Sequence, residues 1–358
     1  MELKKRVLLL AAVLLALCCL FPAFAEDGDA SSSAEWMVFA SRTEAYYSEA
    51  VKTYTMPLYE GGSLAVPVGL TLATGENADI SFSVPQDGQY ELWFTYYTET
   101  QSALPSEMTV KVDGLIPFYE LRRVKLKGLW MDDGVFPLDR YGNEIATTPT
   151  CRRVLLSAGI SDSAGWTDVP FLFELTGGEH TLSLQMQEGS VTLESLEVRA
   201  RSVSPAYAGQ SAEGDALILI EGEQIYSRNK SSIRAAGEFD PGLTPYETDR
   251  RLMNFLDGAS FDSAGDEVTW SFTAEKEGWY QLGFRYRQSI KADFPVFADV
   301  LIDGALPEDE ASGVPFDYAT SFKTMQVNSA QGGEHTFFLS AGEHTRASPG
   351  LRGHKQGS

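Results

Sequence analysis

Cysteine is scarce in this chain of 358 residues, and its three copies are poorly placed for disulfides. Cys18 and Cys19 lie in an apolar leader, so Cys151 is the only cysteine in the remainder. No intramolecular disulfide can form once the leader is removed, and the fold must be held by its core or by metal. Histidine is limited to four residues, and no Gly-x-Ser-x-Gly, His-Glu-x-x-His or phosphate-loop motif occurs. We therefore expect a protein that is not an enzyme.

Basic residues are also in short supply. The chain has 28 Lys and Arg against 50 Asp and Glu, which gives a formal net charge of −22 at pH 7. An acidic chain is repelled by phosphate-rich partners, so we expect no nucleic acid and no anionic membrane among its ligands. Counting carboxylates alone does not exclude a glycosidase acid–base pair, but no motif singles one out.

Residues 1–25 have the three parts of a secretory signal peptide. Basic residues at positions 4–6 precede an apolar run over 7–20, and Ala-Phe-Ala at 23–25 is a small-x-small cleavage site. The apolar run is short for a membrane span, so we expect secretion and no membrane insertion after cleavage. A lipid anchor on Cys18 or Cys19 is disfavoured, because neither cysteine follows a small residue.

Residues 26–59 are predicted to form a tether and a short helix. Positions 26–34 are acidic and rich in serine, a composition typical of disorder. Over 44–54 the apolar and aromatic side chains fall on one helical stripe, at Tyr46, Tyr47, Ala50, Val51 and Tyr54. Pro57 and a pair of glycines then end the helical pattern.

The chain resembles itself at a spacing of about 190 residues. In the first copy the matching positions are Ser81, Phe82, Gly88, Tyr90, Leu92, Phe94, Tyr96, Val110, Asp113 and Gly114. In the second copy they are Ser271, Phe272, Gly278, Tyr280, Leu282, Phe284, Tyr286, Val300, Asp303 and Gly304. Register is kept across two strand-like runs and the loop between them, so the chain holds two copies of one domain.

Both copies alternate apolar and polar residues in short runs separated by turn residues, which predicts an all-β fold of two β-sandwich domains. We assign residues 60–200 to the first module, 201–214 to a linker, 215–345 to the second module and 346–358 to an unpatterned tail. The alternation that follows His180-Thr181 has no counterpart after His344-Thr345. We therefore expect the second module to be incomplete at its C-terminus.

Each copy carries Gly-x-Tyr-x-Leu-x-Phe-x-Tyr, then an Asp-Gly turn, then Glu-His-Thr. These motifs resemble the galactose-binding-like, jelly-roll β-sandwich modules that bind carbohydrate in secreted glycan-active proteins. The resemblance implies a secreted, non-catalytic carbohydrate-binding protein with two tandem modules. Its partner would be an oligosaccharide or a polysaccharide. A structural adhesin, whose modules pack against protein, is a third possibility.

The stretch with Trp130, Asp139, Gly142, Asn143 and Glu144 is similar to the N-terminal region of large Gram-positive extracellular solute-binding proteins. That resemblance implies the alternative function, an accessory N-terminal part of an ABC-transporter solute-binding protein or of a secreted glycan-active enzyme. A transporter permease would then be a partner. In either case the resemblance implies a secreted, cell-surface-associated protein of the Gram-positive type.

The galactose-binding-like family often holds a structural calcium ion with a Glu-x-Glu on its first strand. Glu221 and Glu223 match that pattern, and the resemblance makes them the candidate metal ligands. Two carboxylates supply too few oxygens for calcium, which takes six to eight. The alternative is a pair of solvated carboxylates on an edge strand.

Sugars stack on aromatic faces, and polar side chains read their hydroxyl groups. The long segment over 130–166 shows little alternation, and loops usually carry function. It supplies the candidate sugar-binding residues Trp130, Asp139, Tyr141, Asn143 and Trp166, and the second copy supplies Tyr246, Asn254 and Trp279. The alternative for the long segment is an ordinary loop whose tryptophans close the end of the sandwich.

Overall fold

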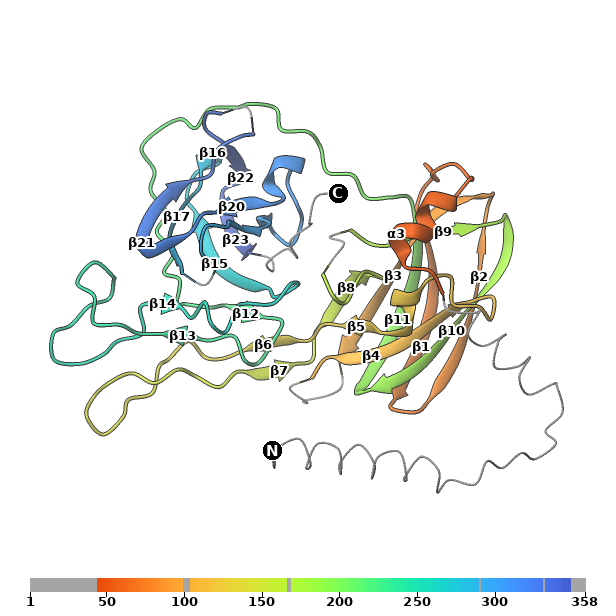
Figure 1. Cartoon of the computed structure of the whole chain (residues 1–358), viewed down its shortest axis with the longest axis horizontal. Helices are drawn as coiled ribbons and strands as arrows, with labels where there is room; N and C mark the ends of the chain where they lie inside the picture. The colour runs from red at the N-terminus through yellow and green to blue at the C-terminus, as the bar shows by residue number, and fades with distance from the viewer. Residues whose placement is uncertain (1–43, 99–103, 166–168, 290, 331, 349–358) are drawn as a thin grey trace, which may run out of the picture. The chain divides into compact units, whose positions relative to one another are not determined.

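The computed structural model describes residues 44–98, 104–165, 169–289, 291–330 and 332–348 (Figure 1). Within these residues the chain is almost entirely β-structure in antiparallel sheets, which confirms the predicted all-β sandwich class. The predicted signal peptide lies outside them, as do Trp166 and residues 349–358 of the tail. In the described part of the chain, no helix is long and apolar enough to cross a membrane.

The first module is built from two sheets. One sheet has the order β1-β11-β3-β8, with β9 also paired to β3, and the other has the order β2-β10-β4-β5. The strands of the first sheet are β1 (Leu64–Ala73), β3 (Gly88–Thr98), β8 (Leu155–Gly159), β9 (Leu172–Leu175) and β11 (Ser190–Arg199). Those of the second are β2 (Asn77–Val84), β4 (Ser106–Val112), β5 (Val124–Leu126) and β10 (Gly178–Glu188).

The core of the first module lies between its two sheets, because alternate residues of each strand point inward. Leu92 and Phe94 of β3 have no exposed surface, as their period-two pattern predicted. They belong to one continuous cluster with Leu182 and Leu184 of β10. The residues between them face outward, and on β4 and β10 those outward residues form the surface considered below.

A short helical segment precedes the first strand, inside the predicted range 44–54. It consists of α3 (Tyr47–Ala50) and the 3-10 turn η1 (Val51–Thr53). Tyr47 is buried and packs edge-on against Phe118, with ring centroids 4.9 Å apart. Its hydroxyl oxygen accepts a hydrogen bond from the Leu172 amide at 3.0 Å. One tyrosine therefore fastens the start of the module to its core.

The second module repeats the part of the first module that runs from β2 to β10. The equivalent elements are β15 (Val268–Ala274), β16 (Gly278–Gln281), β17 (Gly283–Gln288), β18 (Val296–Ala298), β19 (Leu301–Ile302), η3 (Asp309–Ala311), β20 (Val314–Phe316), β21 (Ala319–Gln326), β22 (Thr336–Leu339) and β23 (Gly342–Ser348). No strand equivalent to β11 pairs with β16 or β17 among the described residues.

Each module has one segment that the other lacks. The offset between equivalent residues falls from 190 at β5 and β20 to 164 at β9 and β22, so the first module holds 26 additional residues there. They contain the hairpin of β6 (Leu129–Met131) and β7 (Thr150–Arg152). Before β15, the second module has β12 (Ser227–Arg228), β13 (Ala235–Ala236) and β14 (Phe255–Leu256).

These two segments meet in one sheet, whose order is β19-β23-β15-β12-β6-β7. Arg228 of β12 lies opposite Trp130 of β6 in an antiparallel pair. The hairpin from the sequence of the first module therefore extends a sheet of the second. Part of the long segment that the sequence suggested as an irregular loop is thus regular structure.

The predicted linker, residues 201–214, contacts the second module through Tyr207. The Tyr207 hydroxyl donates to the Glu334 carbonyl at 3.1 Å and accepts from the Thr336 amide at 3.2 Å. Its ring lies 4.4 Å from that of His335, which is fully buried. Thr336 is the equivalent of Leu172, so Tyr207 takes the place that Tyr47 has in the first module.

Candidate functional site

A polar hollow of about 430 Å³ lies on the outer face of β4 and β10 in the first module. Its lining residues are Glu107, Thr109, Lys111, Ile116, Arg122, Arg123, Gln185 and Gln187. Alternation creates it, because Thr109 of β4 pairs with Gln185 of β10 and both side chains leave the sheet on the side away from the core.

Several of the lining side chains are held by hydrogen bonds, and two are not. Glu107 is nearly buried and accepts two hydrogen bonds from Arg123, at 2.7 and 3.0 Å. Lys111 and Gln185 have no side-chain partner among the described residues, and Gln185 is exposed. The hollow thus offers a free ammonium group and a free amide beside a fixed ion pair.

The electrostatics of the hollow differ from those of the whole chain. Three of its lining residues are cationic and one is anionic, and that one carboxylate is paired with Arg123. Its lining includes no histidine, no cysteine and no aromatic residue. Chemically it can donate hydrogen bonds to hydroxyl and carboxylate groups, but it has no nucleophile with an adjacent base.

The sequence prediction missed this surface. The polar residues of an alternating strand usually form only a solvated face. Those in the hollow are Thr109 and Lys111 of β4 and Gln185 and Gln187 of β10. The available signal was that β4 and β10 carry long polar side chains at successive outward positions. Recognising it requires knowing that the two strands are neighbours.

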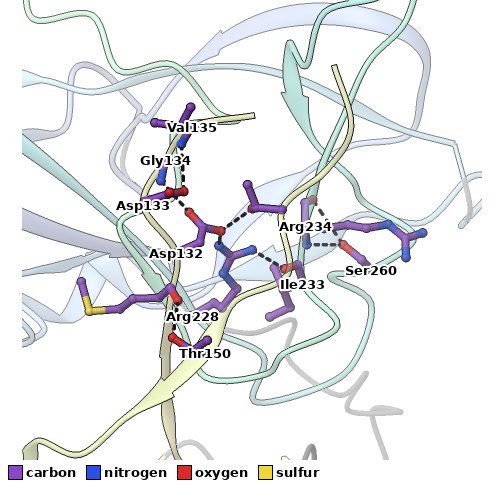
Figure 2. Close-up of polar contacts among 11 residues, drawn as sticks. Asp132, Asp133, Gly134, Val135, Thr150, Arg228, Ile233, Arg234 and Ser260 are labelled. Carbon is purple, nitrogen blue, oxygen red and sulfur yellow. Dashed lines mark hydrogen bonds and ion pairs between the residues drawn. The ribbon is translucent and has the colours of Figure 1, made fainter. Parts of the chain in front are cut away.

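The predicted residue Trp130 lies elsewhere, at the joint between the hairpin and β12. Figure 2 shows the polar contacts at this joint, which include Asp132, Arg228 and Ile233. The Trp130 side chain is only 8% exposed, so the indole face is not available for stacking on a sugar. Beside it Arg228 forms a buried ion pair with Asp132 and donates to the Ile233 carbonyl at 2.7 Å. Trp130 is thus a packing residue in this arrangement, and its role in sugar binding stays a prediction.

Asp139, Tyr141 and Asn143 lie at the far end of the same hairpin. Asp139 accepts hydrogen bonds from the Tyr141 amide at 2.7 Å and from the Asn143 amide at 2.9 Å, and so shapes the turn. The Asn143 side-chain oxygen accepts from the Arg251 amide at 2.9 Å. Tyr141 is exposed, with the Arg140 guanidinium 4.5 Å from its ring. Asp139 and Asn143 thus have structural partners, and Tyr141 alone offers an open ring.

The candidates of the second module do not converge on one place. Asn254 is buried and donates to the carbonyls of Glu238 and Pro245 at 3.0 and 3.1 Å. Trp279 of β16 is half-buried and packs edge-on against Phe338, with ring centroids 5.5 Å apart. Tyr246 is 37% exposed. In the described part of the chain, the side-chain hydrogen bonds of Asn254 and the ring contact of Trp279 do not involve the hairpin, and a role in sugar binding stays a prediction for each.

The predicted metal ligands lie before β12. Glu223 is 3% exposed, and its Oε2 atom has no hydrogen-bond partner. Burial, with added repulsion from Glu221 and Glu144, raises the pKa of Glu223 to about 7. An orphaned buried carboxylate is what a cation would satisfy. The described residues nevertheless form no group of three or more acidic, histidine or cysteine side chains placed to hold a metal, so they do not make a complete calcium site.

The repeated histidines have a structural place in both modules. Asp113 and Asp303 sit in matching turns with positive φ angles of 50° and 51°, each followed by a glycine at 78°, the type I′ geometry of a hairpin. The Asp113 carboxylate lies 2.7 Å from His180 Nδ1, and the Asp303 carboxylate lies 2.8 Å from His344 Nδ1. Each pair ties a turn to a neighbouring strand, Asp113 to β10 and Asp303 to β23.

Comparison with known proteins leaves the family open. No family model matches the chain, and no curated protein matches it. Among solved structures it is similar to the ectodomain of ANX2 from Arabidopsis thaliana, at 10% identity over 84% of this chain and 85% of that one. The TM-score of that match is 0.18, so it carries no argument about fold or function.

Proposed function

We propose that this chain is a secreted, non-catalytic carbohydrate-binding protein, and that the hollow on β4 and β10 of the first module is its binding surface. The observation that carries the proposal is the pair of unpartnered side chains, Lys111 and Gln185, beside the fixed Glu107–Arg123 pair. An amide and an ammonium group held on a rigid sheet can read the hydroxyl groups of a sugar. The motifs shared with galactose-binding-like modules support the same function.

The charge of the hollow indicates the class of sugar. Its three cationic side chains face one already paired carboxylate, although the chain as a whole carries −22. A local excess of positive charge on an acidic protein favours an anionic ligand. We therefore infer an oligosaccharide that carries carboxylate groups, such as one containing uronic acids.

The test is a binding measurement with glycans of both kinds. We expect the wild type to bind uronic-acid oligosaccharides in preference to neutral ones, with an affinity that falls as salt is added. Lys111→Ala and Gln185→Ala should each weaken binding about fivefold or more, since each removes a group with no other partner. Lys276→Ala, a change at an exposed lysine in the second module, is the matched control and should leave affinity unchanged.

Two results would reject the proposal. Equal binding by wild type and both hollow variants, all folded by circular dichroism, would show that the sugar binds elsewhere. If folded wild type binds no glycan, with or without calcium, the accessory role becomes the better proposal. In that role the modules would be the N-terminal part of a solute-binding protein or of a secreted enzyme, and would present another domain.

A further inference from the structure

A pair of exposed tyrosine rings lies on the first module. Tyr46 directly precedes α3, and Tyr119 begins the 3-10 turn η2 (Tyr119–Arg122). The two side chains are 60% and 44% exposed, and their ring centroids lie 5.3 Å apart in an edge-on contact. Such a contact leaves ring faces open, and an open aromatic face is a surface on which a sugar ring can stack.

The backbone around this pair is fixed by hydrogen bonds between the start of α3 and η2. The Tyr119 amide donates to the Ala45 carbonyl at 2.9 Å. The Tyr47 amide donates to the Glu120 carboxylate at 2.9 Å, and the Tyr47 side chain is buried in the core. These contacts hold the residues on both sides of Tyr46. A platform that is already in place loses little conformational entropy when a ligand binds.

The tyrosine pair lies beside the hollow on β4 and β10. Ile116 and Arg122 precede and follow Tyr119 in the sequence, and both line the hollow, as does Arg123. Hydrogen bonds to Glu107 raise the pKa of Arg123 most, the charge of Glu107 adds to them against partial desolvation, and Tyr119 raises the pKa further. Tyr119 is therefore within electrostatic reach of a side chain that lines the hollow.

The second module keeps the backbone of this region but neither the tyrosines nor the cations. The Asp309 amide donates to the Pro205 carbonyl at 2.9 Å, as the Tyr119 amide does to Ala45. At the equivalent positions Tyr46 is replaced by Ala206, Tyr119 by Asp309, Lys111 by Leu301 and Arg123 by Gly313. The aromatic pair and the cationic hollow are thus present together in one copy and absent together from the other, as expected of two parts of one site.

We propose that Tyr46 and Tyr119 form an aromatic subsite beside the hollow, and that a sugar ring of the same glycan stacks on it. This inference rests on the proposed function of the hollow and extends it. The hollow supplies charge and hydrogen bonds but has no aromatic residue, and the tyrosines supply the stacking surface. The ligand is then a chain of sugar units, one held at Lys111 and Gln185 and another lying on the tyrosines.

The test measures affinity against glycan length, by isothermal titration calorimetry with uronic-acid oligosaccharides from the disaccharide upward. We expect wild-type affinity to rise with length, because a longer chain reaches both surfaces. Tyr46→Ala and Tyr119→Ala should each weaken binding of the long oligosaccharides about fivefold or more and leave that of the disaccharide unchanged. Tyr119→Phe keeps the ring and should keep wild-type affinity. Tyr226→Ala, a change at a 46% exposed tyrosine of the second module, is the matched control and should change affinity at no length.

The outcomes separate this subsite from the hollow. If Lys111→Ala weakens binding but both tyrosine variants bind every length as the wild type does, the subsite is refuted and the hollow stands. An equal loss at every length in Tyr119→Ala would mean that this tyrosine only supports the hollow, which also overturns the proposal. Tyrosine-dependent binding that appears only after deletion of residues 26–40 would identify that segment as the occupant of the pair. If the folded wild type binds no glycan, the proposed function fails and the subsite fails with it.

Discussion

At the scale of single residues, the two Asp–His pairs have the same geometry in both modules. In each, one ring nitrogen faces the Asp carboxylate and the other faces a backbone carbonyl, of Thr176 for His180 and of Ser340 for His344. Two acceptors on one ring favour the doubly protonated imidazolium. Burial opposes the charge on His180, but the bonds to Thr176 and Asp113 outweigh it and raise the pKa of His180.

This geometry predicts a pH dependence of stability. A histidine whose pKa is higher in the folded state stabilises the protein fully below about pH 6.5, and that contribution is lost as pH rises through the folded pKa. The hydrogen bond that His344 donates to the Ser340 carbonyl likewise raises the pKa of His344, against burial and with help from Asp303. Asp113→Asn should therefore destabilise the first module by about 1 kcal/mol at pH 5.5 and by less at pH 8.5. Urea unfolding at the two pH values measures the difference, and a larger loss at pH 8.5 would contradict the imidazolium assignment.

We expect Glu223 to behave in the opposite way to these histidines, as a buried acid whose charged form is disfavoured. Its pKa of about 7 lies above the ordinary 4.5, so the folded state holds a proton that the unfolded state has released. Stability should then fall as pH rises from about 4.5 to 7 and stay low above it. Glu223→Gln removes this penalty and should raise stability at pH 8 by roughly 2 kcal/mol.

Calcium provides the control for that prediction. If the wild type binds a structural calcium ion at Glu223, the ion will raise the melting temperature of the wild type and will not raise that of Glu223→Gln. We expect no such difference, because the described residues lack a complete ligand set. A calcium-dependent rise confined to the wild type would restore the calcium site that the sequence suggested for Glu221 and Glu223.

At the scale of elements, the joint between the β6–β7 hairpin and β12 depends on a buried charge pair. The side chains of Arg228 and Asp132 are 1% and 8% exposed, and burial lowers the pKa of Arg228 against the attraction of Asp132. Asp132→Ala leaves that guanidinium buried without its counter-ion, and should cost roughly 3–5 kcal/mol. Chemical denaturation, monitored together with protease sensitivity of residues 221–256, measures the loss.

Two further variants separate charge from packing at this joint. The double change Asp132→Leu with Arg228→Met removes both charges and should recover most of the stability, since apolar replacement of a buried pair is often neutral or better. The control variant Asp133→Ala removes the neighbouring exposed carboxylate, which accepts one hydrogen bond, from the Val135 amide at 3.3 Å. This variant should alter stability by less than about 0.5 kcal/mol. If Asp132→Ala, the double variant and Asp133→Ala all lost a similar amount of stability, the ion pair would make no specific contribution. The hairpin would then be held by its backbone alone.

At the scale of the whole molecule, the two modules should differ in stability. The buried apolar residues of the first module form one continuous cluster, whereas those of the second form two separate ones. Among the residues that the structure describes, no strand pairs with one edge of β16 and β17, and unpaired edges with half-buried neighbours unfold locally at low cost. Limited proteolysis should cut the second module first and leave a resistant fragment that contains β1 to β11. Equal resistance of the two modules would contradict this prediction.

Much of the fold followed from local patterns in the sequence. Alternation in one strand predicted the buried positions Tyr90, Leu92 and Phe94, and the structure confirms them. The hollow on β4 and β10 did not follow, because it joins Thr109 to Gln185 across 76 positions of sequence and polar outward residues look alike wherever they are. Trp130 was a candidate from the sequence, but its pairing with β12 could not be predicted, because a tryptophan in an apparent loop shows no sign of its distant partner.

The sequence by itself determined that this protein has two related all-β modules, because the repeat and the period-two alternation are properties of neighbouring residues. Only the tertiary structure decided that the hairpin bearing Trp130 pairs with β12, and that Glu223 is buried without a partner. It also decided that β11 pairs with β3 in the first module, whereas no strand pairs with the matching edge of β17 among the described residues. These features depend on contacts between residues far apart in the chain, and no local pattern encodes which distant segment arrives beside them.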